Sequence, residues 1–337
     1  MKILAVDTSC DESCVAIFDT ENWKLLADVV HTHIKSMAQF GGIVPEIASR
    51  QHLKALPVTV QEALNRAHLK LEQIDWFVVT NRPGLIGALL VGVTFVKALA
   101  YANDKPYSVL DHMEAHLYSP YLITAEAKRA PEFPWVALVV SGGHTELFYV
   151  KECLNHQWLG GTLDDAAGEA FDKIGKLAGL EYPAGPAIDR LCRERHKSHP
   201  SESFEFPRAQ LEGFSFSFSG LKTAVSLKLA DQKLSDEPKE TVAILSAAQE
   251  AILDSLVTKV TLAETKYQPK NTVVTGGVAC NQRLREKLSH AYFPPVRHCT
   301  DNAAMVAILA AIYHRDGKLN PAPWETSAQT TSTVIGD

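Results

Sequence analysis

The fold is decided by two stretches of the same design, KILAVDTSCDESCVAIFD at residues 2–19 and WVALVVSGGHTELFYV at residues 135–150. Each is an apolar, β-rich run, a short polar turn and a second apolar run. Turns of Gly, Ser, Thr and Asp between such runs predict β-hairpins. Two matching hairpins, each followed by helices, predict a duplicated α/β fold of two lobes with a ligand in the cleft between them. A single large α/β domain is the alternative.

Strands and helices alternate along the rest of the chain, which indicates α/β layers. The junction between the lobes is predicted at residues 120–134, which contain three prolines. The last helix is predicted to begin at Asp301, a good N-cap residue. Further strands are predicted at 23–32, 76–80 and 271–277, and helices at 45–68, 84–102, 164–180, 187–196, 219–230, 239–266, 279–290 and 301–315.

The composition is that of an ordinary globular protein, with 337 residues, 46% hydrophobic and 21% charged. This length is enough for two lobes. A net charge of −6 excludes a broad electrostatic attraction to nucleic acid. Contact with RNA must therefore come from a partner or from a local basic cluster such as RLCRERHKSH at 190–199.

The sequence predicts a cytoplasmic protein. The apolar run at the start is too short for a signal peptide, and no uninterrupted apolar stretch is long enough to span a bilayer. Six cysteines without a C-x-x-C pair predict reduced thiols rather than a disulfide frame. They are Cys10, Cys14, Cys153, Cys192, Cys280 and Cys299.

The run DHMEAHLYS at 111–119 places His112 and His116 four positions apart. On a helix they lie about 40° apart, so both imidazoles can reach one metal ion. The protease motif His-Glu-x-x-His needs a glutamate where this chain has Met113. The glutamate present, Glu114, lies about 180° from the midpoint of the histidines and points away from a shared metal. Two histidines with satisfied ring nitrogens, and no metal, are the alternative.

Two glycine turns follow predicted strands. In VSGGHT at 140–145, Gly142 and Gly143 let backbone N–H groups approach a phosphate. In VVTGGVACNQRLR at 273–285, a base and ribose fit over the Gly-Gly turn, with Asn281 as a polar edge. Each is also compatible with a plain tight turn. No glycine loop continues as Gly-Lys-Ser/Thr, which argues against a P-loop NTPase.

Carboxylates crowd the start of the predicted helix at 164–180. An acidic first turn, favoured by the helix dipole, accounts for Asp164 and Asp165. Asp172 lies deeper in the helix and suits a ribose hydroxyl or a metal. A further turn, YPAGPAIDRL at 182–191, contains Gly185 and leads into a helix that carries Asp189.

Nine motifs occur in order between residues 6 and 305: VDTSCDES, FGGIVPEIASRQH, PGLIGALLVG, HMEAH, VSGGHTEL, DDAAGEAFDKIGKLAGLEYPAGP, FSFSGLKT, TGGVACNQRLR and CTDNAAM. Together they resemble the universal tRNA threonylcarbamoyladenosine synthase catalytic subunit, a family called TsaD in bacteria and formerly O-sialoglycoprotein endopeptidase. The resemblance covers nearly the whole chain, and the HMEAH form is similar to bacterial members.

The resemblance implies the actin/hexokinase/Hsp70-like (ASKHA) fold, with the ligand in the interlobe cleft. It implies transfer of a threonylcarbamoyl group from threonylcarbamoyl-AMP to the N6 amine of the adenosine 3′ of the anticodon, in tRNAs that read ANN codons. It also implies one divalent metal ion per subunit, Fe²⁺ or Zn²⁺. The implied partners are tRNA, a paralogous subunit of the same fold (TsaB-like) and a small ATPase (TsaE-like), with no membrane.

The family's functional residues map onto three sets. The implied metal ligands are His112, His116 and Asp301. The implied adenylate-binding residues are Val139, Val140, Ser141, Gly142, Gly143, Asp172, Gly185, Asp189 and Asn281. Asp11, in the turn of the first hairpin, is our candidate for the catalytic group that positions or deprotonates the amine.

On this reading, residues 1–125 form the lobe with the first hairpin and the histidines. Residues 126–300 form the lobe with the adenylate-binding turns, and 301–337 the terminal segment with the aspartate ligand. One departure lies in NRPGLIG, where Arg82 stands at a position that is usually glycine in the family. It adds bulk near the first lobe but leaves the metal and adenylate positions unchanged.

Three rival functions differ in what they require. A metalloprotease requires Glu114 to serve as a base at the metal, which the helix geometry disfavours. A sugar or acetate kinase of the same fold does not need the His112–His116 pair. A non-catalytic scaffold paralogue does not need intact His112, His116, Asp301 and Asp172.

Overall fold

The computed structural model describes residues 1–34, 37, 40–122, 130–198, 204–230 and 238–335. The chain forms two compact units, Met1–Ala130 with Thr300–Asp337, and Pro131–Cys299. The terminal segment, which the sequence analysis set apart from residue 301, is therefore part of the first unit. Within the junction predicted at 120–134, residues 123–129 lie outside the described residues.

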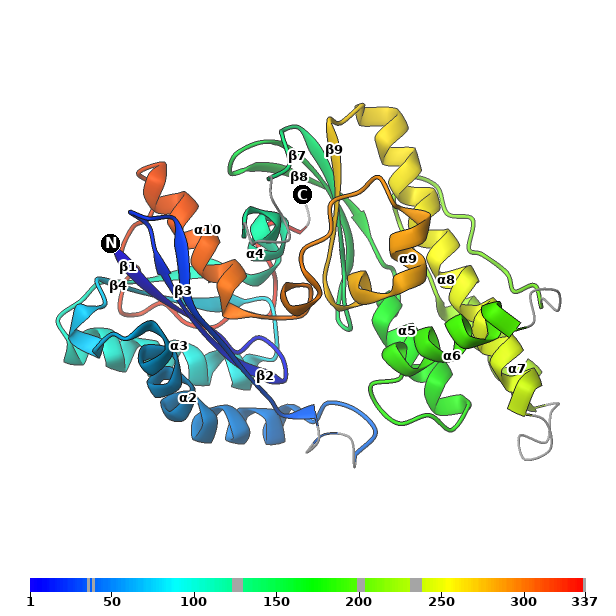
Figure 1. The fold of residues 1–337 in the computed structure, drawn as a ribbon, viewed down its shortest axis with the longest axis horizontal. Coiled ribbons are helices and arrows are strands. Elements are labelled where there is room, and N and C mark those ends of the chain that lie inside the picture. The colour runs from blue at the N-terminus through cyan, green and yellow to red at the C-terminus, as the bar shows by residue number, and fades with distance from the viewer. Residues whose placement is uncertain (35–36, 38–39, 123–129, 199–203, 231–237, 336–337) are drawn as a thin grey trace. The chain divides into compact units, whose positions relative to one another are not determined.

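The first unit is built on a five-stranded sheet in the order β3-β2-β1-β4-β5 (Figure 1). The predicted first hairpin is confirmed, since β1 and β2 pair antiparallel from Lys2↔Asp19 to Asp7↔Cys14. β4 and β5 continue the sheet in parallel with β1. The strands are β1 (Lys2–Asp7), β2 (Glu12–Asp19), β3 (Lys24–Thr32), β4 (Trp76–Arg82) and β5 (Tyr107–Asp111).

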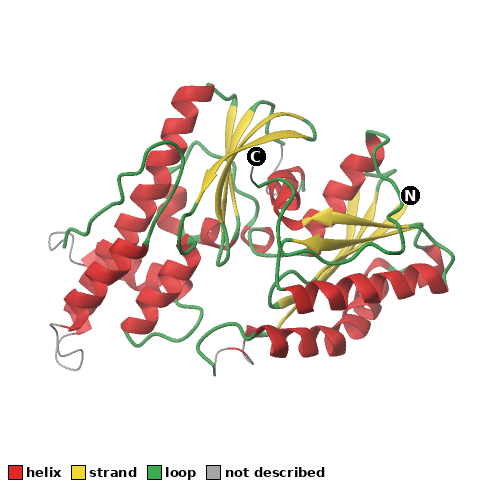
Figure 2. Cartoon of the chain, turned by 180° about the vertical axis from the view of Figure 1, so that it is seen from behind, coloured by secondary structure: helices red, strands yellow, loops and turns green. Residues whose placement is uncertain are grey.

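Helices cover both faces of this sheet. α2 (Pro45–Ala67) and α3 (Ile86–Ala102) lie side by side on one face (Figure 2), where they pack on alternate residues of the strands such as Leu4 and Val6. α10 (Ala303–Arg315) packs against β1, β2 and α4 (His112–Tyr118). Short 3₁₀ helices η1 (Leu71–Gln73) and η2 (Ser119–Tyr121) complete the unit.

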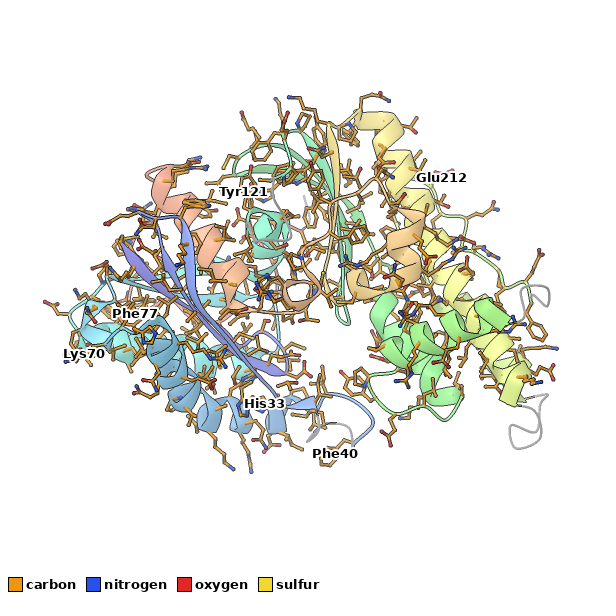
Figure 3. The ribbon with its side chains drawn as sticks, in the orientation of Figure 1. His33, Phe40, Lys70, Phe77, Tyr121 and Glu212 are labelled. Carbon is orange, nitrogen blue, oxygen red and sulfur yellow. The ribbon has the colours of Figure 1, made fainter. Side chains whose placement is uncertain are left out.

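Large side chains from the strands fill the core of the first unit. Phe77 of β4, labelled in Figure 3, is fully buried, and so are Ile3 and Leu4 of β1. Adjacent residues of one strand point to opposite faces of the sheet, so burial of both Ile3 and Leu4 requires helices on both sides. The α2–α3 pair and α10 provide these two layers.

The second unit repeats the plan of the first. Its sheet has the order β8-β7-β6-β9, in which β6, β7 and β8 pair antiparallel and β9 runs parallel to β6. The first unit pairs β3, β2 and β1 with the parallel strand β4 in the same way. The duplicated α/β fold is thus confirmed. The strands are β6 (Trp135–Val140), β7 (Thr145–Glu152), β8 (Asn155–Gly161) and β9 (Asn271–Thr275).

The helices of the second unit pack around one apolar cluster that includes Leu138, Phe171, Ile188 and Ile252. They are α5 (Ala167–Leu177), α6 (Gly185–Ser198), α7 (Ser219–Ala230), α8 (Pro238–Tyr267) and α9 (Gln282–Lys287), with η3 (Gly277–Cys280) and η4 (Val296–His298).

Among the described residues, one helix, Lys239–Tyr267, is long and apolar enough to cross a membrane, by length and composition alone. The sequence analysis predicted no stretch of that kind. Of its most apolar window, 56% is buried inside the protein. Ile244, Ile252 and Leu256 belong to the core cluster, so the apolar composition of α8 is explained by packing within the unit.

The structure corrects three local predictions. α10 is capped by Asn302, whose Oδ1 accepts from the Met305 amide at 2.9 Å, and not by Asp301. α5 begins at Ala167, because Asp164 instead accepts from the backbone amide of Phe218 at 2.8 Å and holds a loop. β5 and β8 were not predicted: β5 has only five residues, and β8, NHQWLGG, lacks β-branched residues and ends in two glycines.

Gly276 is the position at which the second unit requires glycine. It follows β9 with φ of +96°, a region that favours glycine. A Cβ atom there would lie 2.3 Å from the carbonyl oxygen of Val140, at the end of β6. The absence of a side chain therefore allows the ends of two parallel strands to approach.

We expect Gly276→Ala to lower the free energy of unfolding by about 2 kcal/mol or more, from backbone strain and the clash with Val140. The matched control is Gly220→Ala, at an exposed position of α7 where nothing lies within 4 Å of the new Cβ atom. There the alanine should be neutral or stabilising. Urea denaturation followed by circular dichroism measures both, and equal midpoints for the two variants would contradict this account.

Candidate metal centre and nucleotide-binding turns

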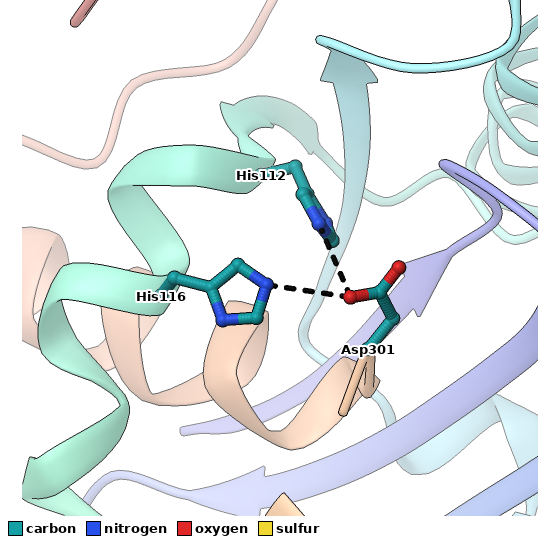
Figure 4. Close-up of side chains that lie close together, drawn as sticks. All are labelled: His112, His116 and Asp301. Carbon is teal, nitrogen blue, oxygen red and sulfur yellow. Dashed lines mark hydrogen bonds and ion pairs between the residues drawn. The ribbon is translucent and has the colours of Figure 1, made fainter. Parts of the chain in front are cut away.

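The three predicted metal ligands meet in the first unit (Figure 4). Asp301 Oδ1 lies 3.5 Å from His112 Nε2 and 3.3 Å from His116 Nε2. One ligand atom from each residue falls within a group of atoms no more than 4.8 Å apart. Two imidazole nitrogens and a carboxylate oxygen are a donor set suited to a divalent transition metal.

The helix that carries both histidines begins where strand β5 ends. Asp111, the last residue of β5, is the N-cap of α4, and its Oδ1 accepts from the amides of Met113 at 2.8 Å and Glu114 at 3.3 Å. His112 is therefore the first residue of the helix, and His116 follows about one turn later on the same face.

The ring orientation of His112 is fixed by Asp7, at the end of β1. Asp7 Oδ2 lies 2.9 Å from His112 Nδ1. Its other oxygen accepts from the Thr80 hydroxyl at 2.7 Å and the Ser9 amide at 3.0 Å. With Nδ1 donating to Asp7, the Nε2 lone pair is free to face a metal, which is the usual support of a metal-bound histidine. The residues present therefore fit a divalent ion.

Sequence reasoning missed Asp7, Ser9 and Thr80 as parts of this centre. Asp7 was assigned no role beyond its place in the first hairpin and its motif. The available signal was a carboxylate at the end of a buried strand. The pairing of β1 with β4, which brings Thr80 beside Asp7, is a long-range contact that residue spacing does not reveal.

The charged groups of the centre shift one another's pKa values. Burial acts to raise the pKa of Asp301, but His112 and His116 overcome it and hold that pKa well below its ordinary value. Burial acts to lower the pKa of His112, but Asp7 and Asp301 raise it well above its ordinary value. The raised pKa favours a proton on His112, which a metal ion would displace on binding.

Asp11 lies in the turn between β1 and β2, buried, in the same unit as the three ligands. Its carbonyl oxygen accepts from the His33 amide at 3.1 Å, which holds the turn. The pKa of the adjacent Glu12 is raised well above its ordinary value by burial and then by Asp11 and Asp301. The turn thus belongs to the electrostatic surroundings of Asp301.

Glu114 is hydrogen-bonded to Tyr313 of α10. Its carboxylate oxygens accept from the Tyr313 hydroxyl at 2.9 and 3.0 Å. Burial raises the pKa of Glu114 to about 7. Glu114, Tyr313 and Arg82 line a cavity of about 250 Å³, and Arg82 Nε donates to Asn81 Oδ1 at 3.3 Å. The departure at position 82 therefore lies beside Glu114 rather than among the metal ligands.

In the second unit, the turn between β6 and β7 is organised by Ser141. Its Oγ accepts from the amides of Gly143 at 3.3 Å and His144 at 3.1 Å. Its carbonyl oxygen accepts from the Gly168 amide at 3.1 Å, which ties the turn to the start of α5. The amide of Gly143, predicted to face a phosphate, is directed to Ser141 Oγ in this structure.

The other predicted residues of this segment divide into core and surface. Val139 and Val140 are fully buried in β6, so only their backbone can face a ligand. Gly142 and Gly143 are exposed, and nothing lies within 4 Å of a Cβ atom built on either. Space at these glycines is therefore available to a ligand.

Three of the predicted adenylate-binding residues, Asp172, Gly185 and Asp189, lie near the start of α6. Asp172 Oδ1 accepts from the Ala184 amide at 2.7 Å, immediately before Gly185, the first residue of α6. Asp189 is buried, and its Oδ1 has no hydrogen-bond partner among the described residues. Burial raises the pKa of Asp189, although the backbone at Gln282 acts to lower it. A hydroxyl donor would satisfy the Oδ1 atom.

Asn281 has a structural role. It is the N-cap of α9, with Oδ1 accepting from the Leu284 amide at 2.9 Å. Its Nδ2 donates to Gln249 Oε1 at 2.9 Å. The side chain predicted as a polar edge for the nucleoside thus already binds the protein through both ends.

Two sheets of one plan, with helices on their faces, define the class of ASKHA proteins. Two solved structures of HypF share the fold at low identity. The T. kodakarensis protein has a TM-score of 0.62 at 14% identity, covering 94% of this chain and 48% of that one. The full-length phosphate- and nucleotide-bound form has a TM-score of 0.59 at 13% identity, covering 93% and 55%.

The family described as "TsaD: tRNA N6-adenosine threonylcarbamoyltransferase" matches residues 24–308. Proteins of that name are similar over nearly the full length. The protein of Kosmotoga olearia is 41% identical over 95% of this chain and 96% of its own. That of Fervidobacterium nodosum is 43% identical over 91% of each. This chain belongs to the TsaD family of transferases, as its motifs predicted.

Asp7→Asn should weaken the binding of Co²⁺ or Zn²⁺ by about 10- to 100-fold, because it removes the carboxylate that orients His112. The matched control is Asp75→Asn, whose carboxylate accepts from the Lys2 amide at the other end of β1. Titration monitored by absorbance and calorimetry measures both affinities. Equal affinity in Asp7→Asn and the wild type would show that Asp7 does not support the centre.

Glu146, in the second hairpin, makes the stability of the protein depend on pH. It is buried in β7, its Oε2 accepts from Trp158 Nε1 at 2.7 Å, and burial raises its pKa from 4.5 to about 7. Between these pH values the folded chain binds more protons at Glu146 than the unfolded chain does. The contribution of Glu146 to stability is therefore fully present below pH 4.5 and is lost as the pH rises through 7.

Glu146→Gln should abolish this dependence while keeping an acceptor for Trp158. Relative to the variant, the wild type should lose about 2–3 kcal/mol of unfolding free energy between pH 5 and pH 8. Urea denaturation of both proteins across that range measures the difference. A constant difference at every pH would contradict the assignment.

Proposed function

We propose that this transferase moves a threonylcarbamoyl group from threonylcarbamoyl-AMP to the N6 amine of the adenosine 3′ of the anticodon, in tRNAs that read ANN codons. The observation that carries the proposal is the convergence of His112, His116 and Asp301 in a member of the TsaD family. A divalent metal is consistent with this group, and we propose Fe²⁺ or Zn²⁺ as the ion.

The reaction is acyl transfer from a mixed anhydride. The amine nitrogen forms a bond to the carbamoyl carbon, the bond from that carbon to the phosphate oxygen breaks, and AMP leaves. The amine must lose a proton, and Asp11 is the proposed acceptor at the first hairpin turn. The metal, held by His112, His116 and Asp301, would supply Lewis-acid stabilisation of phosphate or carbamoyl oxygens.

The second unit supplies the proposed adenylate site. The unpartnered Oδ1 of buried Asp189 would accept a ribose hydroxyl, with Asp172 beside the same turn. The exposed backbone at Gly142 and Gly143 would approach the phosphate. Asn281 would shape the nucleoside side by holding the first turn of α9, since its side chain binds Leu284 and Gln249.

We further propose a cytoplasmic complex with a TsaB-like subunit of the same fold and a TsaE-like ATPase. The supporting observation is the net charge of −6, since the chain offers no broad positive potential to the phosphates of tRNA. A shared binding surface in a complex would provide the missing positive charge. Arg190, Arg193 and Arg195 on α6 are candidates for this chain's contribution.

The rival functions make different demands. A protease would need Glu114 at the metal, whereas Glu114 binds Tyr313. A non-catalytic scaffold would not need the buried bond between Asp7 and His112. Both observations favour the transferase.

The test is nucleoside mass spectrometry of tRNA after incubation with the purified chain, its partner subunits and threonylcarbamoyl-AMP. Wild type should form threonylcarbamoyladenosine, and His112→Ala should reduce the yield at least 100-fold because a metal ligand is lost. The matched control is Glu114→Gln on the same helix, which keeps an acceptor for Tyr313 and should retain transfer.

A second arm separates acid–base chemistry from metal binding. Asp11→Asn should slow single-turnover transfer by about 10²- to 10⁴-fold with unchanged metal affinity. Near-normal transfer by Asp11→Asn would remove it from the mechanism. Peptide cleavage that depends on Glu114, with no modified nucleoside from the wild type, would favour the protease instead.

A further inference from the structure

We propose that the C-terminal tail, residues 318–335, is a positioning element of the metal centre, acting through Ser332, Thr333 and Asp111. The inference rests on the proposed function in taking His112, His116 and Asp301 as metal ligands. It concerns a segment outside all nine motifs and outside the match to the family, which ends at residue 308. The tail and the three ligands belong to the same compact unit.

The two oxygens of Asp111 serve different segments. Oδ1 accepts from the amides of Met113 and Glu114 and begins α4. Oδ2 accepts from Ser332 Oγ at 2.7 Å, from the Thr333 amide at 2.9 Å and from Thr333 Oγ1 at 3.3 Å. One buried carboxylate therefore joins the tail to the first turn of the helix that carries the histidines.

The tail reaches Asp111 along a defined path. The Ser108 hydroxyl donates to the Asn320 carbonyl oxygen at 2.7 Å, and the Ala322 amide donates to the Tyr107 carbonyl oxygen at 2.8 Å. Further along, the Gln329 amide donates to the carbonyl oxygen of Asn81 at 2.8 Å. These bonds follow the edge strand β5 and the end of β4.

Two further bonds hold the tail, one from the end of β4 and one from helix α3. Asn81 Nδ2 donates to the Ser327 carbonyl oxygen at 3.0 Å, and Lys97 Nζ donates to the Trp324 carbonyl oxygen at 2.6 Å. The tail is thus fixed at several successive positions before Ser332. It is therefore a rigid support for Asp111 rather than a single chance contact.

The metal centre is sensitive to this support because α4 is short. A helix of seven residues has few internal hydrogen bonds, so its direction depends on its cap and its neighbours. His112 directly follows the cap residue, so a shift of Asp111 moves that ligand at once. Metal ligation tolerates errors of only about 0.2 Å, and loss of supporting contacts typically costs 10- to 100-fold in affinity.

The test compares metal affinities of full-length and altered chains at a temperature where circular dichroism shows all of them folded. Removal of residues 332–337 should weaken Co²⁺ binding by about tenfold or more. Ser332→Ala/Thr333→Val, which keeps the Thr333 amide, should give a smaller loss in the same direction. The matched control, Thr330→Ala/Thr331→Ala, changes two hydroxyls of the same tail and should bind Co²⁺ like the wild type.

A double-mutant cycle distinguishes positioning from general destabilisation. Asp111→Ser keeps one oxygen to cap α4 but has no second oxygen for the tail. If the tail acts through Asp111, removing residues 332–337 from Asp111→Ser should cause no further loss of affinity. A full additional loss in that background would overturn the inference.

The outcomes also separate this inference from the proposed function. Wild-type Co²⁺ binding with unchanged affinity in the shortened chain would overturn the role of the tail and leave the metal centre standing. Failure of the wild type to bind Co²⁺, Zn²⁺ or Fe²⁺ would overturn both.

Discussion

The structure depends on the bond between Asp7 and His112. It joins the end of the central strand β1 to the first residue of α4, 105 positions later in the chain. It fixes the orientation of the His112 ring, and the charge of Asp7 raises the pKa of that imidazole against the effect of burial. Without this bond, the His112 ring beside Asp301 would lose the carboxylate that orients it. The sheet therefore supplies the carboxylate that orients His112, and the helix α4 carries the two histidine ligands.

Sequence reasoning was most successful where one segment carries the whole signal. The two hairpins and the His112–His116 pair are local patterns, and the structure contains them where they were predicted. Asp7, Thr80 and Asp111 were missed as supports because their partners are 73 to 221 positions away. The cap of α10 was misplaced by one residue because Asp301 and Asn302 are both good caps, and only the tertiary contact of Asp301 with the histidines decides between them.

In the second unit, sequence reasoning identified candidate residues but not which of their atoms are available to a ligand. Its candidate residues came from glycine turns, from carboxylates on helices and from family resemblance, and in the structure several of them also form hydrogen bonds that hold the protein's own backbone. Asn281 caps a helix, Asp172 accepts from the Ala184 amide, and Ser141 Oγ accepts from the Gly143 amide of its own turn. Buried Asp189 retains an unpartnered oxygen among the described residues. A residue type in a motif therefore indicates where a ligand could bind, and only hydrogen-bond accounting indicates which atoms remain for it.

The repeated hairpin gives the two units corners of opposite polarity. In the first, Asp7 ends β1, Asp11 lies in the turn and Glu12 begins β2, whereas the second turn carries Gly142 and Gly143. Carboxylates attract cations, and an exposed glycine backbone leaves room for an anion. A substitution that suits one corner therefore has the wrong sign of charge for the other, although the two share one backbone plan.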